Sequence, residues 1–210
     1  MPGCACWGFP ISATWLRRKH FPRPFPQPIR TTRCWRPAAG PSPVWPRSSG
    51  ACWNDWSSTK EDTVRIAVAS DHAGFALKEA LKAFMEELGH EVVDFGAHSP
   101  DPSDYPDWIA PAARAVAAGE CERGVFFCGT GLGAMLTANK VRGIRAVVCH
   151  ECASARLSRQ HNDANVLCMG GRIVGLELAR DVLQVWLQTS FQGGRHARRV
   201  EKVMALEVER

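Results

Sequence analysis

Residues 124–133 read GVFFCGTGLG, an apolar run from Gly124 that ends in the thiol of Cys128 and opens into a glycine-rich loop. A short apolar run bounded by turn residues is typical of a buried strand, and the stretch that follows, as far as Lys140, has helical character. Glycines let the backbone approach a ligand, and a helix N-terminus favours a thiolate and an anionic substrate. The stretch therefore predicts acid–base chemistry on a phosphorylated or enolisable molecule.

Strand and helix signals alternate on both sides of this stretch, across the 147 residues from Val64 to Arg210, which is the size of one domain. This alternation predicts a three-layer α/β/α, Rossmann-like fold with a five-stranded parallel sheet. We expect strands at 64–69, 91–95, 124–128, 145–148 and 166–169. We expect helices at 74–88, 106–118 with Asp104 as its cap, 133–140, 153–161, 175–189 and 195–209.

Ligands of such sheets bind outside the carboxyl ends of the strands. Asp71 and His72 follow the first predicted strand, Cys128 ends the third, and Arg172 follows the fifth. We therefore expect these side chains to face one site. The last predicted helix begins with Arg195 and carries Arg199 one turn later, so both can grip one phosphate.

The first 63 residues differ in composition from the rest. Residues 1–60 hold 10 of the 14 prolines, 6 of the 8 tryptophans, and nine Lys or Arg against one acid, so they carry +8 and the remainder carries −3. Pro22, Pro24, Pro26 and Pro28 block both helix and central strand. We expect 1–63 to be a disordered leader, which is either transit-like or the product of a mis-assigned start near Val64.

Charge and cysteine content also bear on location and partners. The basic charge belongs to the leader, so nothing indicates that the predicted domain binds nucleic acid. Arg17, Arg18 and Lys19 interrupt the best candidate for a signal or membrane segment. Nine cysteines without a secretory signal indicate free thiols in a reducing compartment. We therefore expect a cytoplasmic protein that binds neither nucleic acid nor membrane.

The stretch Cys149-His150-Glu151-Cys152 is a candidate metal site by residue type. A zinc site normally needs a second pair of ligands at suitable spacing, and none follows in the sequence. We therefore expect no metal, and we interpret these cysteines as small packing residues near a strand end.

Seven short motifs together resemble the type B ribose-5-phosphate isomerases, over about 64–206. They are Ser70-Asp71-His72-Ala73-Gly74, Asp104-Tyr105-Pro106, Cys128-Gly129-Thr130-Gly131-Leu132-Gly133, Ala138-Asn139-Lys140, Gly143-Ile144-Arg145-Ala146, Ser158-Arg159-Gln160-His161-Asn162-Asp163 and Gly194-Arg195-His196. The resemblance implies interconversion of ribose 5-phosphate and ribulose 5-phosphate in the pentose phosphate pathway, without a cofactor. It also implies a homodimer, or a tetramer of such dimers, whose active sites combine residues of both subunits. Galactose-6-phosphate and allose-6-phosphate isomerases share the pattern, so the preferred sugar stays open.

Aldose–ketose isomerisation needs a base, an oxyanion cradle and a group that opens the cyclic sugar. The resemblance assigns the base to Cys128. Some family members use a serine there with a glutamate a few residues later, but residues 132–135 read LGAM, without a carboxylate. The enediolate oxygens would be held by the loop that follows, namely by Gly129, Thr130, Gly131, Leu132 and Gly133.

The remaining roles are also implied by the resemblance. His161 corresponds to the ring-opening residue and Asn162 to a contact with a substrate hydroxyl. The phosphate would be bound by His72, Arg195 and Arg199, with Arg172 as a further substrate-binding arginine. Asp71 either orients His72 or binds a sugar hydroxyl, and Tyr105 lies near the pocket mouth or packs in the ordinary way.

Two other classes of function compete with an isomerase. The spacing Gly129-x-Gly131-x-x-Ala134, with Glu151 near the end of the next strand, fits a dinucleotide-binding fingerprint. That motif normally follows the first strand, whereas here it follows the third, and too few residues remain for a substrate domain. A non-catalytic sugar-phosphate sensor is the other alternative, although Cys128 and His161 give no sign of lost catalysis.

Overall fold

The structure, a computed structural model, describes residues 63–207 of the 210. The predicted leader therefore lies outside the described residues, apart from its last one, and its disorder and origin stay predictions. The described residues contain no helix with both the length and the apolar character needed to cross a membrane.

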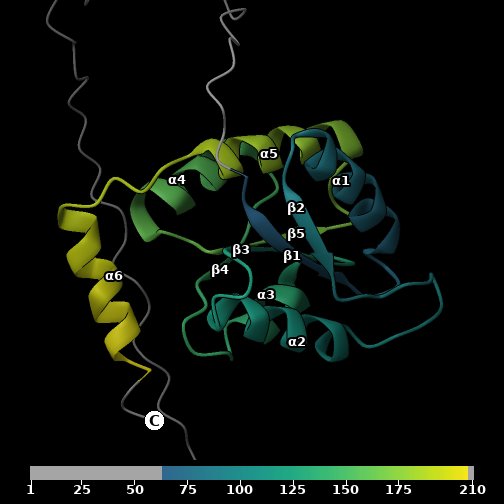
Figure 1. Cartoon of the computed structure of the whole chain (residues 1–210), viewed down its shortest axis with the longest axis horizontal. Helices are drawn as coiled ribbons and strands as arrows, with labels where there is room; N and C mark the ends of the chain where they lie inside the picture. Colours follow the sequence, from purple (N-terminus) through teal and green to yellow (C-terminus); the bar gives the residue numbers. More distant parts are fainter. Residues whose placement is uncertain (1–62, 208–210) are drawn as a thin grey trace, which may run out of the picture. The chain divides into compact units, whose positions relative to one another are not determined.

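Five parallel strands form one sheet in the order β2-β1-β3-β5-β4, which confirms the predicted three-layer α/β/α fold (Figure 1). The strands are β1 (Arg65–Ser70), β2 (Glu91–Asp94), β3 (Arg123–Cys128), β4 (Ala146–Val148) and β5 (Val166–Gly170). The helices are α1 (Phe75–Glu87), α2 (Tyr105–Ala117), α3 (Leu132–Ala138), α4 (Cys152–Asn162), α5 (Leu176–Gln188) and α6 (Arg195–Ala205).

The side chains of the central strands pack into two separate cores, one on each face of the sheet, because successive residues of a strand point to opposite faces. On β3, Phe127 packs in the core with α1, α4 and α5, whereas Phe126 and Cys128 pack in the core with α2 and α3. Figure 1 shows these two helical layers on opposite faces of the sheet. The strand β3 is buried on both faces, which explains its unbroken apolar sequence.

The predicted elements all exist, with small differences at their ends. Asp104 occupies the N-cap position of α2, but its side chain makes no capping hydrogen bond, so the expected side-chain cap is wrong. The helix α6 ends at Ala205, earlier than the expected Glu209. Trp186 and Leu187 of α5 are both buried in the core on one face of the sheet, and Trp186 is fully inaccessible.

Candidate active site

The loop after β3 wraps around the sulfur of Cys128. The backbone N–H of Gly131 donates to Cys128 Sγ across 3.1 Å, and the cysteine is almost fully buried. Gly131 has φ +80°, and a β-carbon there would lie 3.0 Å from the carbonyl carbon of Met169 on β5. A glycine is required at this position because both the conformation and the close approach exclude a side chain. The predicted strand–loop–helix unit thus delivers a thiol and amide donors to one point.

Asp71, at the end of β1, shapes the neighbouring turn. Its Oδ1 accepts hydrogen bonds from the backbone N–H groups of Ala73 and Gly74, both at 2.9 Å. A β-carbon on Gly74 would lie 2.9 Å from the backbone nitrogen of Cys128, so this turn packs directly on the cysteine. Asp71 therefore helps to fix the floor of the candidate site.

The ring of His72 pairs with the backbone of Ser103. His72 Nδ1 lies 3.1 Å from the carbonyl oxygen of Ser103 and 3.2 Å from its backbone nitrogen, so Ser103 can pair with either tautomer. Ser103 is thus the partner that the structure gives His72 Nδ1, and the choice for Asp71 between orienting His72 and binding a sugar hydroxyl stays a prediction. Either pairing fixes the ring and directs Nε2 away from Ser103.

Arg172 and Tyr105 border the same loop. The backbone N–H of Arg172 donates to the carbonyl of Gly129 at 3.0 Å, and a β-carbon on Gly129 would lie 3.5 Å from the Arg172 guanidinium. A β-carbon on Gly133 would lie 2.8 Å from the Tyr105 ring. Thr130 and Leu132 are exposed on the rim of the loop. The expected convergence at the carboxyl ends of β1, β3 and β5 is thus present in the structure.

The other predicted site residues gather around a cavity of about 460 Å³. His161 and Asn162 come from the last turn of α4, and Arg199 comes from α6. The cavity is lined by Asn139, Ile144, Arg145, Ala146, Val147, His161, Asn162, His196, Arg199, Val200 and Val203.

His196, for which the sequence predicts no role, lies at the centre of this second group. Its ring stacks on that of His161 with centroids 4.2 Å apart and planes 2° from parallel. The Nε–H of Arg195 donates to His196 Nε2 at 3.3 Å, so Arg195 faces this histidine. Burial, together with the neighbouring His161, Arg195 and Arg199, lowers the pKa of His196. The helical spacing of His196, Val200 and Val203 could have identified it as an inward-facing residue.

These two groups lie at opposite ends of the sheet within one chain. Cys128 is the last residue of β3, at the carboxyl end, whereas α4 runs back from β4 and ends just before Val166 opens β5. The five residues of β5 span roughly 16 Å at about 3.3 Å each. His161 and Cys128 of a single chain are therefore well beyond hydrogen-bond reach of one another.

The remaining candidate metal and dinucleotide residues have local structural roles. Glu151 accepts hydrogen bonds from the backbone N–H groups of Ala153 and Ser154, both at 2.6 Å, and caps α4. Cys149 is buried, and burial raises the pKa of its thiol. Within residues 63–207, no group of three or more His, Cys, Asp or Glu is arranged to hold a metal ion. The expectation of a reaction without metal or cofactor stays a prediction.

Comparison with known proteins gives consistent matches over the described part of the chain. The model of a family described as Ribose/Galactose Isomerase matches residues 66–203. The ribose-5-phosphate isomerase B of Escherichia coli is 51% identical over 146 residues, which are 70% of this chain and 98% of that protein. The D-erythrulose-4-phosphate isomerase of Pectobacterium atrosepticum is 39% identical over 142 residues, which are 66% of this chain and 91% of that protein.

Solved structures match over the same part. The ribose-5-phosphate isomerase B of Clostridium thermocellum is 51% identical with a TM-score of 0.68, and the match covers 69% of this chain and 98% of that one. The type B ribose 5-phosphate isomerase of Trypanosoma brucei is 42% identical with a TM-score of 0.67, covering 69% and 99% of the two chains. Sequence and fold therefore point to the same relatives.

Proposed function

This chain belongs to the ribose/galactose isomerase family, and we propose that it interconverts D-ribose 5-phosphate and D-ribulose 5-phosphate through an enediolate. It is an aldose–ketose isomerase acting on a sugar phosphate. The pentose is favoured because two of its relatives, each 51% identical, bear the name ribose-5-phosphate isomerase B. The reaction would place the protein in the pentose phosphate pathway, in the cytoplasm.

Cys128 is the proposed base, which removes the proton from carbon 2 of the open-chain aldose and returns it to carbon 1. The Gly131 N–H that points at Cys128 Sγ supports this role, because a hydrogen bond to sulfur stabilises the thiolate. Backbone amides of Gly129, Leu132 and Gly133, with the Thr130 hydroxyl, would hold the oxygens that become charged in the transition state. Asp71 would contact a sugar hydroxyl.

His161 is the proposed ring-opening residue, and it would act in an active site shared between two subunits. The observation that carries this proposal is the separation of Cys128 and His161 at the two ends of the sheet. Both are needed on one sugar, so the second must come from another copy of the chain. In a two-fold homodimer each copy can supply the group that the other needs, which gives two complete sites.

Exposed apolar side chains beside the Cys128 loop support the same arrangement. Leu132 and Leu136 on α3 are 54% and 58% exposed, and Tyr105 nearby is 38% exposed. Apolar side chains that gather on a surface are typical of a site that another protein covers. A second copy seated here would bury these side chains and could bring its own His161, Asn162 and Arg199 to the loop.

The phosphate would be bound by basic side chains from both groups. Arg199 lines the cavity beside His161, and Arg195 extends from the same helix, α6. Arg172 borders the Cys128 loop and His72 follows β1, and both would approach from the other chain. Charge-assisted hydrogen bonds from several such groups suit a dianionic phosphate.

A four-carbon substrate is a second candidate, because relatives 39% and 44% identical bear the name D-erythrulose-4-phosphate isomerase. Initial rates of the full chain with ribose 5-phosphate, erythrose 4-phosphate, allose 6-phosphate and galactose 6-phosphate would decide, in the presence of a chelator. We expect the highest kcat/KM for ribose 5-phosphate, and the same value for residues 64–210 alone. A preference for another sugar would change the substrate and keep the mechanism. No turnover of any would contradict the proposal.

A further inference from the structure

Asp163, the residue directly after α4, has an unusual backbone conformation. It is the one non-glycine residue with positive φ between residues 63 and 207, with φ 46° and ψ 46°. This left-handed conformation is uncommon for a residue that carries a β-carbon, and it persists where the surroundings hold it. Asp163 closes the turn that carries His161 and Asn162, so what holds it also holds the proposed ring-opening group.

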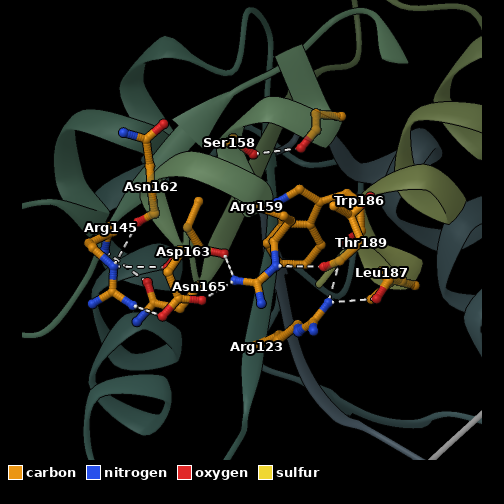
Figure 2. A network of polar contacts seen from close by, with 12 residues as sticks. Arg123, Arg145, Ser158, Arg159, Asn162, Asp163, Asn165, Trp186, Leu187 and Thr189 are labelled. Atoms are coloured by element: carbon orange, nitrogen blue, oxygen red, sulfur yellow. Dashed lines mark hydrogen bonds and ion pairs between the residues drawn. The ribbon is translucent and has the colours of Figure 1, made fainter. Parts of the chain in front are cut away.

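Two arginines, Arg159 on α4 and Arg145 just before β4, hold the carboxylate of Asp163 (Figure 2). Arg159 Nη1 donates to Oδ1 at 2.9 Å, and Arg145 Nη2 donates to Oδ2 at 3.0 Å. The Arg159 side chain is only 9% exposed and that of Asp163 is 34% exposed, so the pair is buried on the arginine side and partly open to water on the carboxylate side. Removing the carboxylate would leave two guanidinium groups facing each other, which is unfavourable when one of them is buried.

The same arginines also hold the backbone around His161 and Asn162. Arg145 Nε donates to the carbonyl oxygens of Asn162 and Asp163, at 3.2 and 2.8 Å, and Arg159 Nη1 donates to the carbonyl of Ala164 at 2.6 Å. These contacts capture the carbonyl groups that a helix leaves without partners at its end. Figure 2 shows the Asn162 side chain extending away from the arginines, which leaves its amide available for a ligand.

Both arginines are in turn anchored to distant parts of the chain. The Arg159 guanidinium lies 5.7 Å from the ring centroid of the buried Trp186. Its Nε contacts the carbonyl of Thr189 at 3.4 Å. Arg145 reaches α6, where its Nη1 lies 3.6 Å from Met204 Sδ. The network thus joins the end of α4 to the rigid core and to the helix that carries Arg199.

We propose that Asp163 is a positioning residue: through Arg145 and Arg159 it fixes the orientation of His161 and Asn162, and so sets the rate of sugar-ring opening. The inference rests on the proposed function. A purely structural role would lower stability and slow every reaction alike. A positioning role for ring opening would slow the reaction of a cyclic substrate more than that of an open-chain one.

Two measurable reactions provide this contrast. Conversion of ribose 5-phosphate needs ring opening, whereas exchange of the carbon 1 proton of ribulose 5-phosphate with deuterium from the solvent needs only the enediolate step. Ribose 5-phosphate is mostly cyclic, whereas ribulose 5-phosphate has no free hydroxyl that could close a five-membered ring on its carbonyl. In the full chain, Asp163→Ala removes the carboxylate and introduces alanine, which adopts the left-handed backbone less readily than aspartate. Asp163→Gly removes the carboxylate but accepts the left-handed backbone, and Asp163→Asn keeps both the backbone preference and oxygen acceptance. Met85→Ala, a change at a buried residue of α1, serves as a control that lowers only stability.

We expect the Ala and Gly variants to convert ribose 5-phosphate about 10- to 100-fold more slowly, but to exchange the carbon 1 proton of ribulose 5-phosphate only a few-fold more slowly, because small misplacements of a reacting group are costly. Asp163→Asn should recover most of the loss, and Met85→Ala should lower the Tm without changing the ratio of conversion to exchange. Equal losses in conversion and exchange for Ala and Gly would overturn the inference while leaving the isomerase function intact. A wild-type chain inactive on ribose 5-phosphate would instead overturn the proposed function, and the inference with it.

Discussion

The two ends of the sheet build their groups of polar residues in different ways. At the carboxyl end, backbone amides and close glycine contacts surround the buried Cys128, and the contacts join loops that follow three adjacent strands. At the amino end, side chains from the end of α4, from α6, and from Arg145 and the start of β4 border a cavity. The proposed proton transfer by Cys128 needs a fixed environment shielded from water, whereas the proposed binding of the substrate needs side chains long enough to reach it. Each end alone lacks what the other provides.

The largest expected effect comes from the sulfur at the carboxyl end. Cys128→Ala should lower kcat about 10²- to 10⁴-fold, since an acid–base group contributes about that much, while substrate binding stays close to normal. Cys168→Ala is the matched control, because Cys168 is a fully buried thiol on the adjacent strand β5. Steady-state kinetics of both variants would test this. Substantial turnover by Cys128→Ala would mean that the base is another residue.

At the amino end we expect an effect on binding rather than on chemistry. Arg199→Ala should raise KM for the sugar phosphate about 10- to 100-fold with little change in kcat, because a hydrogen bond to a charged group contributes roughly 1.5–3 kcal/mol. Arg198→Ala, which removes an exposed arginine one position away, is the control and should leave KM unchanged. If both variants gave the same KM as the wild type, Arg199 would not bind the phosphate.

The smallest expected effect is on stability, and it is seen by comparing two glycines with nearly the same backbone conformation. Gly131 and Gly119 have φ +80° and +78°, but a β-carbon on Gly119 would meet open space whereas one on Gly131 would meet β5. Alanine at either position should lower the free energy of unfolding by about 1–2 kcal/mol, because it must adopt a left-handed backbone. Gly131→Ala should lower it by about 1–3 kcal/mol more, because the added β-carbon is pressed against β5. Urea unfolding would measure both, and equal losses would mean that the loop is not held against β5.

The difference between the two ends of the sheet also explains which features could be predicted from the sequence. The group at the carboxyl end is encoded locally, because Cys128 and its glycines are contiguous and Asp71, His72 and Arg172 each follow a recognisable strand. The strand signals were clear since central parallel strands are apolar on both faces. The existence and order of every element, and the convergence of these residues, were therefore predicted correctly.

The group at the amino end depends on contacts that no local pattern encodes. The stacking of His196 on His161 and the hydrogen bonds of Arg145 to Asp163 join residues that are far apart in the sequence. Their spacing in sequence carries no fixed period, so only the folded chain reveals them. The side-chain cap expected from Asp104 is absent, because a residue type that is preferred at the N-cap does not guarantee that its side chain makes the capping hydrogen bond.

The proposal of an active site shared between two subunits is tested most directly by mixing two inactive chains. Cys128→Ala and His161→Ala should each lack turnover of ribose 5-phosphate alone. Co-expressed in equal amounts, they should form hybrid dimers in which one site receives an intact Cys128 and an intact His161 from different chains. Random pairing should then restore about one quarter of wild-type activity, because half of the dimers are hybrids with one complete site. No recovery in a sample shown to contain hybrid dimers would contradict the account, since it would place both groups in the same chain.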